Sequence, residues 1–237
     1  MNRSQLKLAA ILLLCAPSVL GAQSRTTVLL DPAHGGGDPG AILAGSLPEK
    51  QVTLALSSRL RTALAAQNFN VVATRDNDTT TLADPDLRAG IANHARAIVC
   101  LVLHATGSGS GVHLYTSNLE APDSPGPPPI PWTTAQAGYV TESQHLANRL
   151  GLGLLADHVA ALVSSASIRP LDNLTCPAVL VELAPLNNPG ASPTSPSDAA
   201  YQQRVAGAIA KSLVTWREGL LSTTPRASAN TDAGSQP

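Results

Sequence analysis

Aromatic residues are scarce in this chain of 237 residues, and neither acidic nor basic residues are in clear excess. It has only two tryptophans, three tyrosines and one phenylalanine, and its formal net charge is −1. The chain therefore has too few aromatic rings to stack on bases and no excess of basic residues to bind phosphates. This excludes the usual modes of nucleic-acid recognition. Hydrophobic residues make up 43% of the chain, enough for a buried core, so wholesale disorder is excluded as well. The length suits one ordinary domain.

Cysteine is also scarce, with only three in the chain. Cys15 falls in an N-terminal apolar segment, which leaves Cys100 and Cys176 for the folded part. Two cysteines cannot make the disulfide framework of a small secreted domain, although they could pair in an oxidising compartment. Because each lies in or beside an apolar run typical of a strand, the sequence favours two buried, unpaired thiols.

Residues 1–22 have the parts of a secretory signal peptide. Two basic residues precede an apolar run, and small residues close the segment; these are Arg3 and Lys7, residues 8–15, and Gly21-Ala22. Pro17 interrupts the run before it reaches the 18 or more apolar residues, roughly, that a membrane span needs. We expect cleavage after residue 22, which changes the net charge from −1 to −3, and a periplasmic or secreted protein with no stable membrane span.

Apolar runs typical of strands alternate with helical patterns along residues 23–221. Strands are predicted at 26–30, 70–74, 97–103, 111–116 and 178–181, and helices at 51–66, 86–96 and 199–221, with one or two more in 141–164. The run 97–103 is almost purely apolar, as expected of a central strand buried on both faces. This alternation predicts a single α/β domain with a mostly parallel, twisted sheet and helices on both faces.

Two segments fall outside this pattern. Residues 121–132 contain six prolines, which predicts an exposed, stiff loop or insertion. Residues 222–237 have no apolar periodicity, which predicts a disordered tail.

Three of the apolar runs lead into an ionisable residue. The run 26–30 leads to His34, the run 97–103 to His104, and the run 178–181 to Glu182. Because the carboxyl ends of parallel strands line the ligand-binding crevice of an α/β sheet, we expect these side chains to converge. Glu49, at the start of a predicted helix, is a fourth candidate. Two imidazoles and one carboxylate are a set that holds a catalytic zinc and leaves one position open for water.

The two glutamates can divide the remaining work in two ways. Hydrolysis of an amide needs a base for the attacking water and an acid for the leaving nitrogen, and one unligated carboxyl group can serve as both. Closeness to His34 in sequence favours Glu49 as the ligand, and the apolar strand before Glu182 favours that residue as the acid and base. Since strand order cannot be read from spacing, the opposite assignment stays open at this point.

Several short motifs occur in a recognisable order. They are the loop DPAHGGGDPGA from Asp31, the pair Glu49-Lys50, the triplet Thr74-Arg75-Asp76, the pairs Ala92-Asn93 and His104-Ala105, and the segment 177–182. Over about residues 26–220 the chain resembles the zinc-dependent N-acetylmuramoyl-L-alanine amidases of the amidase-3 type. The resemblance implies zinc (Zn²⁺) bound by His34, Glu49 and His104, Glu182 as the catalytic residue, and hydrolysis of the bond between muramic acid and the first L-alanine of peptidoglycan. We expect peptidoglycan as the partner of a monomeric protein.

Weaker predictions concern the surroundings of these four residues. His113, Thr106 and Asn187 are predicted substrate contacts, and Asp31 and Asp38 are predicted to orient His34 from behind. Arg75 and Arg88 are expected to be structural and to tie the loop after the second strand.

The sequence offers two alternatives to the hydrolase, a dinucleotide-binding site and an inactive module. Three glycines of the loop match G-x-G-x-x-G, but prolines and a further glycine keep the segment irregular where a dinucleotide site would begin a helix; the matching residues are Gly35, Gly37 and Gly40. The chain also departs from the resembled family at Ala33, usually glycine, at Thr106, usually asparagine, and at 183–186. Ala33 fits only if the backbone there has no positive φ. These departures permit a catalytically weak or inactive module that binds peptidoglycan or regulates another hydrolase, whereas the presence of all four site residues favours the enzyme.

Overall fold

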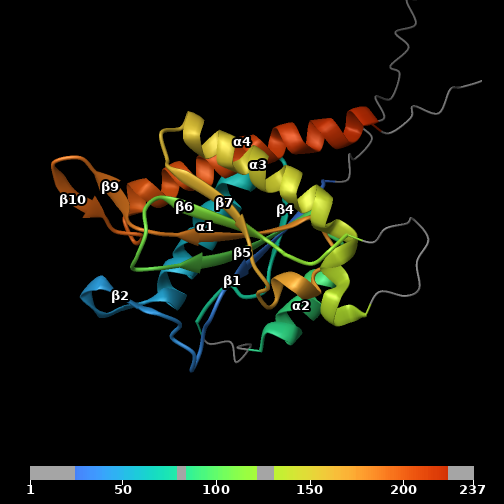
Figure 1. The fold of residues 1–237 in the computed structure, drawn as a ribbon, viewed down its shortest axis with the longest axis horizontal. Coiled ribbons are helices and arrows are strands. Elements are labelled where there is room, and N and C mark those ends of the chain that lie inside the picture. Colours follow the sequence, from blue (N-terminus) through green and yellow to red (C-terminus); the bar gives the residue numbers. More distant parts are fainter. Residues whose placement is uncertain (1–24, 79–83, 122–130, 224–237) are drawn as a thin grey trace, which may run out of the picture.

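The computed structural model describes residues 25–78, 84–121 and 131–223 (Figure 1). The predicted signal peptide lies outside these ranges, as do residues 122–130 of the proline-rich segment and residues 224–237 of the predicted tail. The first two residues of that predicted tail belong instead to the end of the last helix.

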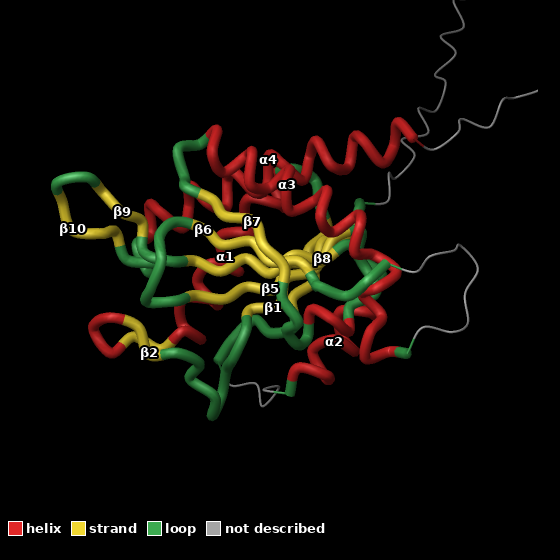
Figure 2. The backbone as a smooth tube through the Cα atoms, in the orientation of Figure 1, coloured by secondary structure: helices red, strands yellow, loops and turns green. Residues whose placement is uncertain are grey.

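A six-stranded sheet forms the centre of the molecule (Figure 2). Its order is β4 (Asn70–Ala73), β1 (Thr27–Pro32), β5 (Val99–Ala105), β8 (Ala178–Leu183), β6 (Val112–Thr116) and β7 (Ala161–Ser165). The first four strands are parallel to one another, β6 is antiparallel to β8, and β7 is parallel to β6. The mostly parallel sheet that the sequence predicts is therefore confirmed.

Helices cover both faces of this sheet (Figure 1). One face carries α1 (Glu49–Ala66), α3 (Val140–Ala156) and α4 (Ala199–Thr223), and α4 packs on both α1 and α3. The other face carries α2 (Pro85–His94) and the short 3-10 helix η3 (Leu171–Asn173), against which η2 (Trp132–Tyr139) packs. The remaining elements are small: the antiparallel pairs β2 (Ile42–Leu43) with β3 (Leu47–Pro48) and β9 (Leu186–Asn188) with β10 (Ala191–Thr194), and η1 (Ala44–Ser46).

Strand alternation sorts the residues of β5 between two cores. Leu101 and Leu103 are fully buried against the layer of α1, α3 and α4, whereas Cys100 and Val102 are fully buried against the layer of α2. Since side chains alternate along a strand, His104 lies on the same face as Cys100 and Val102. The alternation of side chains along β5 thus decides on which face of the sheet His104 lies.

The sequence prediction for residues 141–164 is wrong in its second half. Helix α3 ends at Ala156, and residues 161–165 form the edge strand β7. His158 has a positive φ of 58°, which ends the helix and turns the chain back toward the sheet. Leu162 and Val163 are exposed at this edge, so an apolar run that resembles a buried helical segment is instead an outer strand.

The two cysteines outside the N-terminal segment form a disulfide, contrary to the prediction of unpaired thiols. Cys100 lies in β5 and Cys176 just before β8, with 6.1 Å between their Cα atoms. The pairing depends on β5 and β8 being neighbours, a fact that the sequence does not contain.

Replacing both cysteines by alanine is expected to lower the free energy of unfolding by about 2–4 kcal/mol, since the bond closes a loop with a sequence separation of 76. Urea denaturation of the oxidised protein and the double variant measures this difference. Reduced wild-type protein is the control and should resemble the variant; equal midpoints for all three would contradict the prediction.

No helix within the described ranges is both long and apolar enough to cross a membrane.

Candidate metal centre and active site

His34 is presented by the loop that follows β1. Its backbone has a φ of 64°, and reciprocal backbone hydrogen bonds between Gly35 and Asp38 close the turn behind it. The imidazole Nδ1 lies 2.8 Å from Oδ2 of Asp38, so the other ring nitrogen, Nε2, is directed to Glu49. Ala33 is fully buried but has no positive φ, because the left-handed backbone falls on His34. The methyl group at residue 33 is therefore compatible with the loop.

Glu49 begins α1 and is almost fully buried, with 4% of its surface exposed. Its Oε2 accepts a hydrogen bond from the amide of Ala41 and lies 3.1 Å from Nε2 of His34. Its Oε1 accepts from the amide of Ala105 and lies 2.7 Å from Nδ1 of His104. Burial raises the pKa of Glu49, but the hydrogen bonds from the two histidines and two amides outweigh it and hold the pKa far below its usual range. Glu49 is therefore ionised at neutral pH.

The pKa values of His34 and Asp38 are shifted by their neighbours. The hydrogen bond to Glu49 raises the pKa of His34; burial opposes this shift, and the hydrogen bond to Asp38 adds to it. The hydrogen bond to His34 in turn lowers the pKa of Asp38. In the metal-free protein, His34 is thus held between two carboxylates that favour its protonated form.

His34, Glu49 and His104 together form a candidate metal site. Each offers one ligand atom, and the three atoms lie within 4.8 Å of one another. One carboxylate serves both imidazoles, and Nε2 of His104 is buried with no hydrogen-bond partner among the described residues. Asp38 leaves Nε2 of His34 free of any partner except Glu49, which is how a carboxylate orients a metal-binding histidine. This donor set fits a divalent metal ion with nitrogen and oxygen ligands.

Glu182 lies directly beside this cluster in the sheet. In the register of the strands it pairs with His104 of β5 on one side and with His113 of β6 on the other. Side chains at paired positions share a face of the sheet, so these three residues form a row at the carboxyl end of β8. Oε2 of Glu182 lies 2.8 Å from Nδ1 of His113.

The family of the chain follows from its similarity to known proteins. Residues 28–215 match the model of a family described as N-acetylmuramoyl-L-alanine amidase. The chain belongs to this amidase family. The match confirms the family that the motifs around the four site residues indicate.

Two curated members illustrate how far the similarity reaches. A germination-specific N-acetylmuramoyl-L-alanine amidase of Bacillus subtilis is 30% identical over 202 residues, which are 80% of this chain and 78% of that protein. The amidase AmiC of Neisseria meningitidis is 30% identical over 131 residues, which are 54% of this chain and 29% of that protein. The chain therefore spans less than a third of the length of this second relative.

Solved structures of such amidases share the fold. An amidase from Mycobacterium smegmatis gives a TM-score of 0.63 at 22% sequence identity, with 82% of this chain and 97% of that chain covered. An amidase from Clostridium difficile 630 gives a TM-score of 0.61 at the same identity and coverage.

The other candidate residues of this amidase lie in different places. Asp38 contacts His34, but Asp31 does not: its buried carboxylate accepts a hydrogen bond from Thr74 at 2.6 Å and lies 3.6 Å from Nε of Arg88. The structure thus separates the two aspartates predicted to orient His34.

Of the predicted substrate contacts, Thr106 lies in the loop between β5 and β6, and Asn187 of β9 lies beside that loop. The hydroxyl of Thr106 is 3.2 Å from that of Ser108, and the backbone amide of Asn187 donates to the hydroxyl of Ser110. Both residues therefore help to shape this loop, and their contact with substrate stays a prediction.

Two basic residues, Arg75 and Lys50, donate hydrogen bonds to the backbone of the loop that carries His34. Arg75 is buried, and its guanidinium donates to the carbonyl oxygens of Pro32, Ala33 and Lys50. The Nζ of Lys50 donates to the carbonyl of Gly36 at 2.7 Å. The sequence prediction placed Arg75 in support of its own loop, and the structure extends that support to the loop that carries His34.

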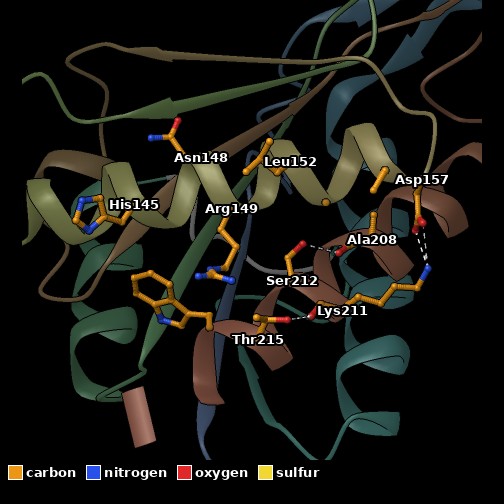
Figure 3. A pocket seen from close by; sticks show the side chains of 12 residues that line it. His145, Asn148, Arg149, Leu152, Asp157, Ala208, Lys211, Ser212 and Thr215 are labelled. Atoms are coloured by element: carbon orange, nitrogen blue, oxygen red, sulfur yellow. Dashed lines mark hydrogen bonds and ion pairs between the residues drawn. The ribbon is translucent and has the colours of Figure 1, made fainter. Parts of the chain in front are cut away.

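A separate groove of about 730 Å³ runs between α3 and α4 (Figure 3). Arg149 of α3 and Lys211 and Trp216 of α4 help to line it, and Lys211 forms an ion pair with Asp157 at 2.8 Å. None of the four candidate site residues lines this groove. The candidate metal site at the sheet edge and this groove between the helices are therefore separate.

Proposed function

We propose that this amidase hydrolyses the amide bond between N-acetylmuramic acid and the first L-alanine of peptidoglycan, with zinc as its metal. The observation that carries the proposal is the convergence of His34, Glu49 and His104 within 4.8 Å, beside Glu182, in a chain of the amidase family. The donor set of two imidazoles and one carboxylate supports zinc and leaves a position open for water or substrate.

When bound, zinc would act as a Lewis acid that polarises the substrate carbonyl and makes a water molecule more acidic. His34 and His104 would hold it through neutral ring nitrogens, and Glu49 through a carboxylate oxygen. These ligands are themselves hydrogen-bonded: Asp38 contacts His34, and the backbone amides of Ala41 and Ala105 donate to Glu49. These contacts fix the ligands before any metal arrives.

Glu182 is proposed as the general base and acid. Its carboxylate would take a proton from the attacking water as the new carbon–oxygen bond forms. The same carboxyl group would then give that proton to the alanine nitrogen as the carbon–nitrogen bond breaks. The products are a lactyl carboxylic acid and an amine, and transfer of the acid's proton leaves a carboxylate and an ammonium group. One group serves both steps because the two transfers occur in sequence at the same carbon.

The experiment that tests the function is digestion of purified cell-wall sacculi by residues 23–237. The expected result is release of stem peptides with new L-alanine amino termini from intact glycan strands. Protein that binds zinc but releases no peptides would favour the inactive, peptidoglycan-binding module instead. Protein that binds no zinc and releases no peptides would contradict the proposed function.

Export to the peptidoglycan layer is part of the same proposal. We propose that residues 1–22 direct the chain out of the cytoplasm and are removed, and that the protein then acts in the periplasm or outside the cell as a monomer. Amino-terminal sequencing of the mature protein should give Gln23 first. Retention of residues 1–22 would contradict this assignment.

Gly40 should strengthen metal binding although it is no ligand. A Cβ atom there would lie 2.6 Å from Cδ2 of His34 and 2.8 Å from Oε2 of Glu49, on a backbone with a φ of 67°. Gly40→Ala is expected to weaken zinc affinity by about 10- to 100-fold, measured by competition with a chelating dye. Gly37→Ala is the matched control from the same loop, since a Cβ there meets nothing within 4 Å. Equal affinities for the two variants would contradict the prediction.

Zinc affinity should fall as the pH falls below neutral. The hydrogen bond to Glu49 raises the pKa of His34, and zinc must displace the proton that this imidazole then carries. In metal-free protein the protonated His34 stabilises the fold below its unfolded pKa, and this contribution is lost as pH rises through the raised value. The increase in melting temperature on adding zinc should therefore be larger at pH 8 than at pH 5.5. An increase that does not change with pH would contradict this.

A further inference from the structure

A histidine of the antiparallel strand β6 faces the proposed catalytic glutamate. His113 and Glu182 are directly paired in the register of β6 and β8, and Nδ1 of His113 lies 2.8 Å from Oε2 of Glu182. Both side chains are mostly buried, with 15% and 25% of their surfaces exposed. An ionised carboxylate can only accept hydrogen bonds, so Nδ1 of His113 is the donor when Glu182 is ionised.

The imidazole ring of His113 is itself held in place. The loop between β5 and β6 passes over it at Gly109, where a Cβ atom would lie 2.5 Å from Cε1 and 2.9 Å from Nε2 of the ring. Gly109 has a φ of 83°, a conformation that suits glycine. The ring of Tyr115 packs edge-on at a centroid distance of 6.5 Å. The ring is therefore fixed by a loop, a neighbouring ring and the carboxylate.

The far end of this loop is anchored to the strand that carries Glu182. The amide of Gly111 donates to the carbonyl of Pro185, and the amide of Ala184 donates to the carbonyl of Gly111, both at 2.9 Å. The hydroxyl of Tyr201 donates to the carbonyls of Gly111 and Ala184. The loop over His113 thus keeps its position relative to β8.

We propose that His113 is a positioning residue for Glu182. The hydrogen bond from Nδ1 engages Oε2 and so fixes the orientation of the carboxyl group, which leaves Oε1 for the proton transfers. This inference rests on the proposed function, because it assigns the proton transfers to Glu182. It differs from a substrate contact, since the His113 nitrogen that it uses is already occupied by the carboxylate.

The test compares two replacements of His113 in the zinc-loaded protein acting on a soluble muropeptide. His113→Leu keeps an apolar side chain of similar bulk but has no donor, and kcat should fall by about 10- to 100-fold with KM and zinc content unchanged. His113→Asn places an amide donor near the position of Nδ1, and its kcat should return to within a few-fold of wild type. An unchanged kcat in His113→Leu, a change confined to KM, or loss of zinc would each overturn the proposal.

A second pair of variants moves the ring without removing it. Gly109→Ala should lower kcat in the same direction as His113→Leu, because its methyl group displaces the imidazole. Gly107→Ala is the matched control from the same loop, where a Cβ meets nothing within 4 Å. Equal kcat values for these two variants would count against a positioning role.

Imidazole nitrogen-15 spectra separate this inference from the proposed function. In zinc-loaded wild type, the His113 signal, assigned by its absence in His113→Asn, should show a protonated Nδ1, and it should shift in Glu182→Gln. If wild type hydrolyses no muropeptide, the proposed function fails. The spectra still show whether His113 donates a hydrogen bond to Glu182. An unprotonated Nδ1, or a His113 signal that does not shift in Glu182→Gln, would overturn the positioning role by itself.

Discussion

Glu182→Gln is expected to lower kcat by about 10²- to 10⁴-fold while the protein keeps its metal. The amide has the size of the carboxyl group but cannot take a proton from water or return one to the leaving nitrogen. Zinc content should be unchanged because the metal-binding cluster consists of His34, Glu49 and His104. Single-turnover hydrolysis of a muropeptide and metal analysis of the same sample measure both quantities.

Two further variants make this result specific. Glu142→Gln makes the same chemical change at an exposed residue of α3 and should leave kcat at the wild-type value. Glu49→Gln should instead lose the metal, since the amide cannot supply the negative charge that both histidines face. Metal loss from Glu182→Gln with retention by Glu49→Gln would reverse the roles of the two carboxylates.

Arg75→Met is expected to lower the free energy of unfolding by about 3–5 kcal/mol. Its guanidinium is buried and donates to four backbone carbonyls, those of Pro32, Ala33, Lys50 and Asn77, and to the hydroxyl of Thr53. Methionine fills much of the same volume but leaves these acceptors without their donors, and each unsatisfied buried group costs about 1–3 kcal/mol. Urea denaturation measures the loss, and zinc affinity should fall in parallel because two of these carbonyls, those of Pro32 and Ala33, precede His34.

Arg61→Met is the matched control for this variant. Arg61 pairs with Asp76, and their side chains are 39% and 69% exposed, so the pair lies in solvent. Exposed ion pairs contribute about 0–1 kcal/mol, and the midpoint should hardly move. Similar losses for the two arginine variants would show that Arg75 has no special structural role.

Local pattern was enough to predict most of the parallel part of the fold. The apolar run of β5 and the stripe Val52, Leu56, Leu60 and Leu64 of α1 each follow from the periodicity of one element. The four site residues could be proposed because three of them follow apolar runs, and carboxyl ends of parallel strands share an edge. These features require no knowledge of which strands are neighbours.

What the sequence could not predict depends on neighbours far apart in the chain. The Cys100–Cys176 disulfide requires β5 beside β8, and the contact of His113 with Glu182 requires β6 to run antiparallel to β8. Likewise, β7 is an edge strand only because β6 is available to pair with it. Strand order is set by the packing of the whole domain, so no local pattern contains it.

Metal analysis of purified residues 23–237 tests the central claim most directly, because that claim is that His34, Glu49 and His104 together bind one zinc ion. After dialysis against trace zinc, wild-type protein should hold about one zinc per chain, and His34→Ala and His104→Ala should hold essentially none at the same folded content. A wild-type protein without zinc, or a His34→Ala variant that keeps a full equivalent, would contradict the account.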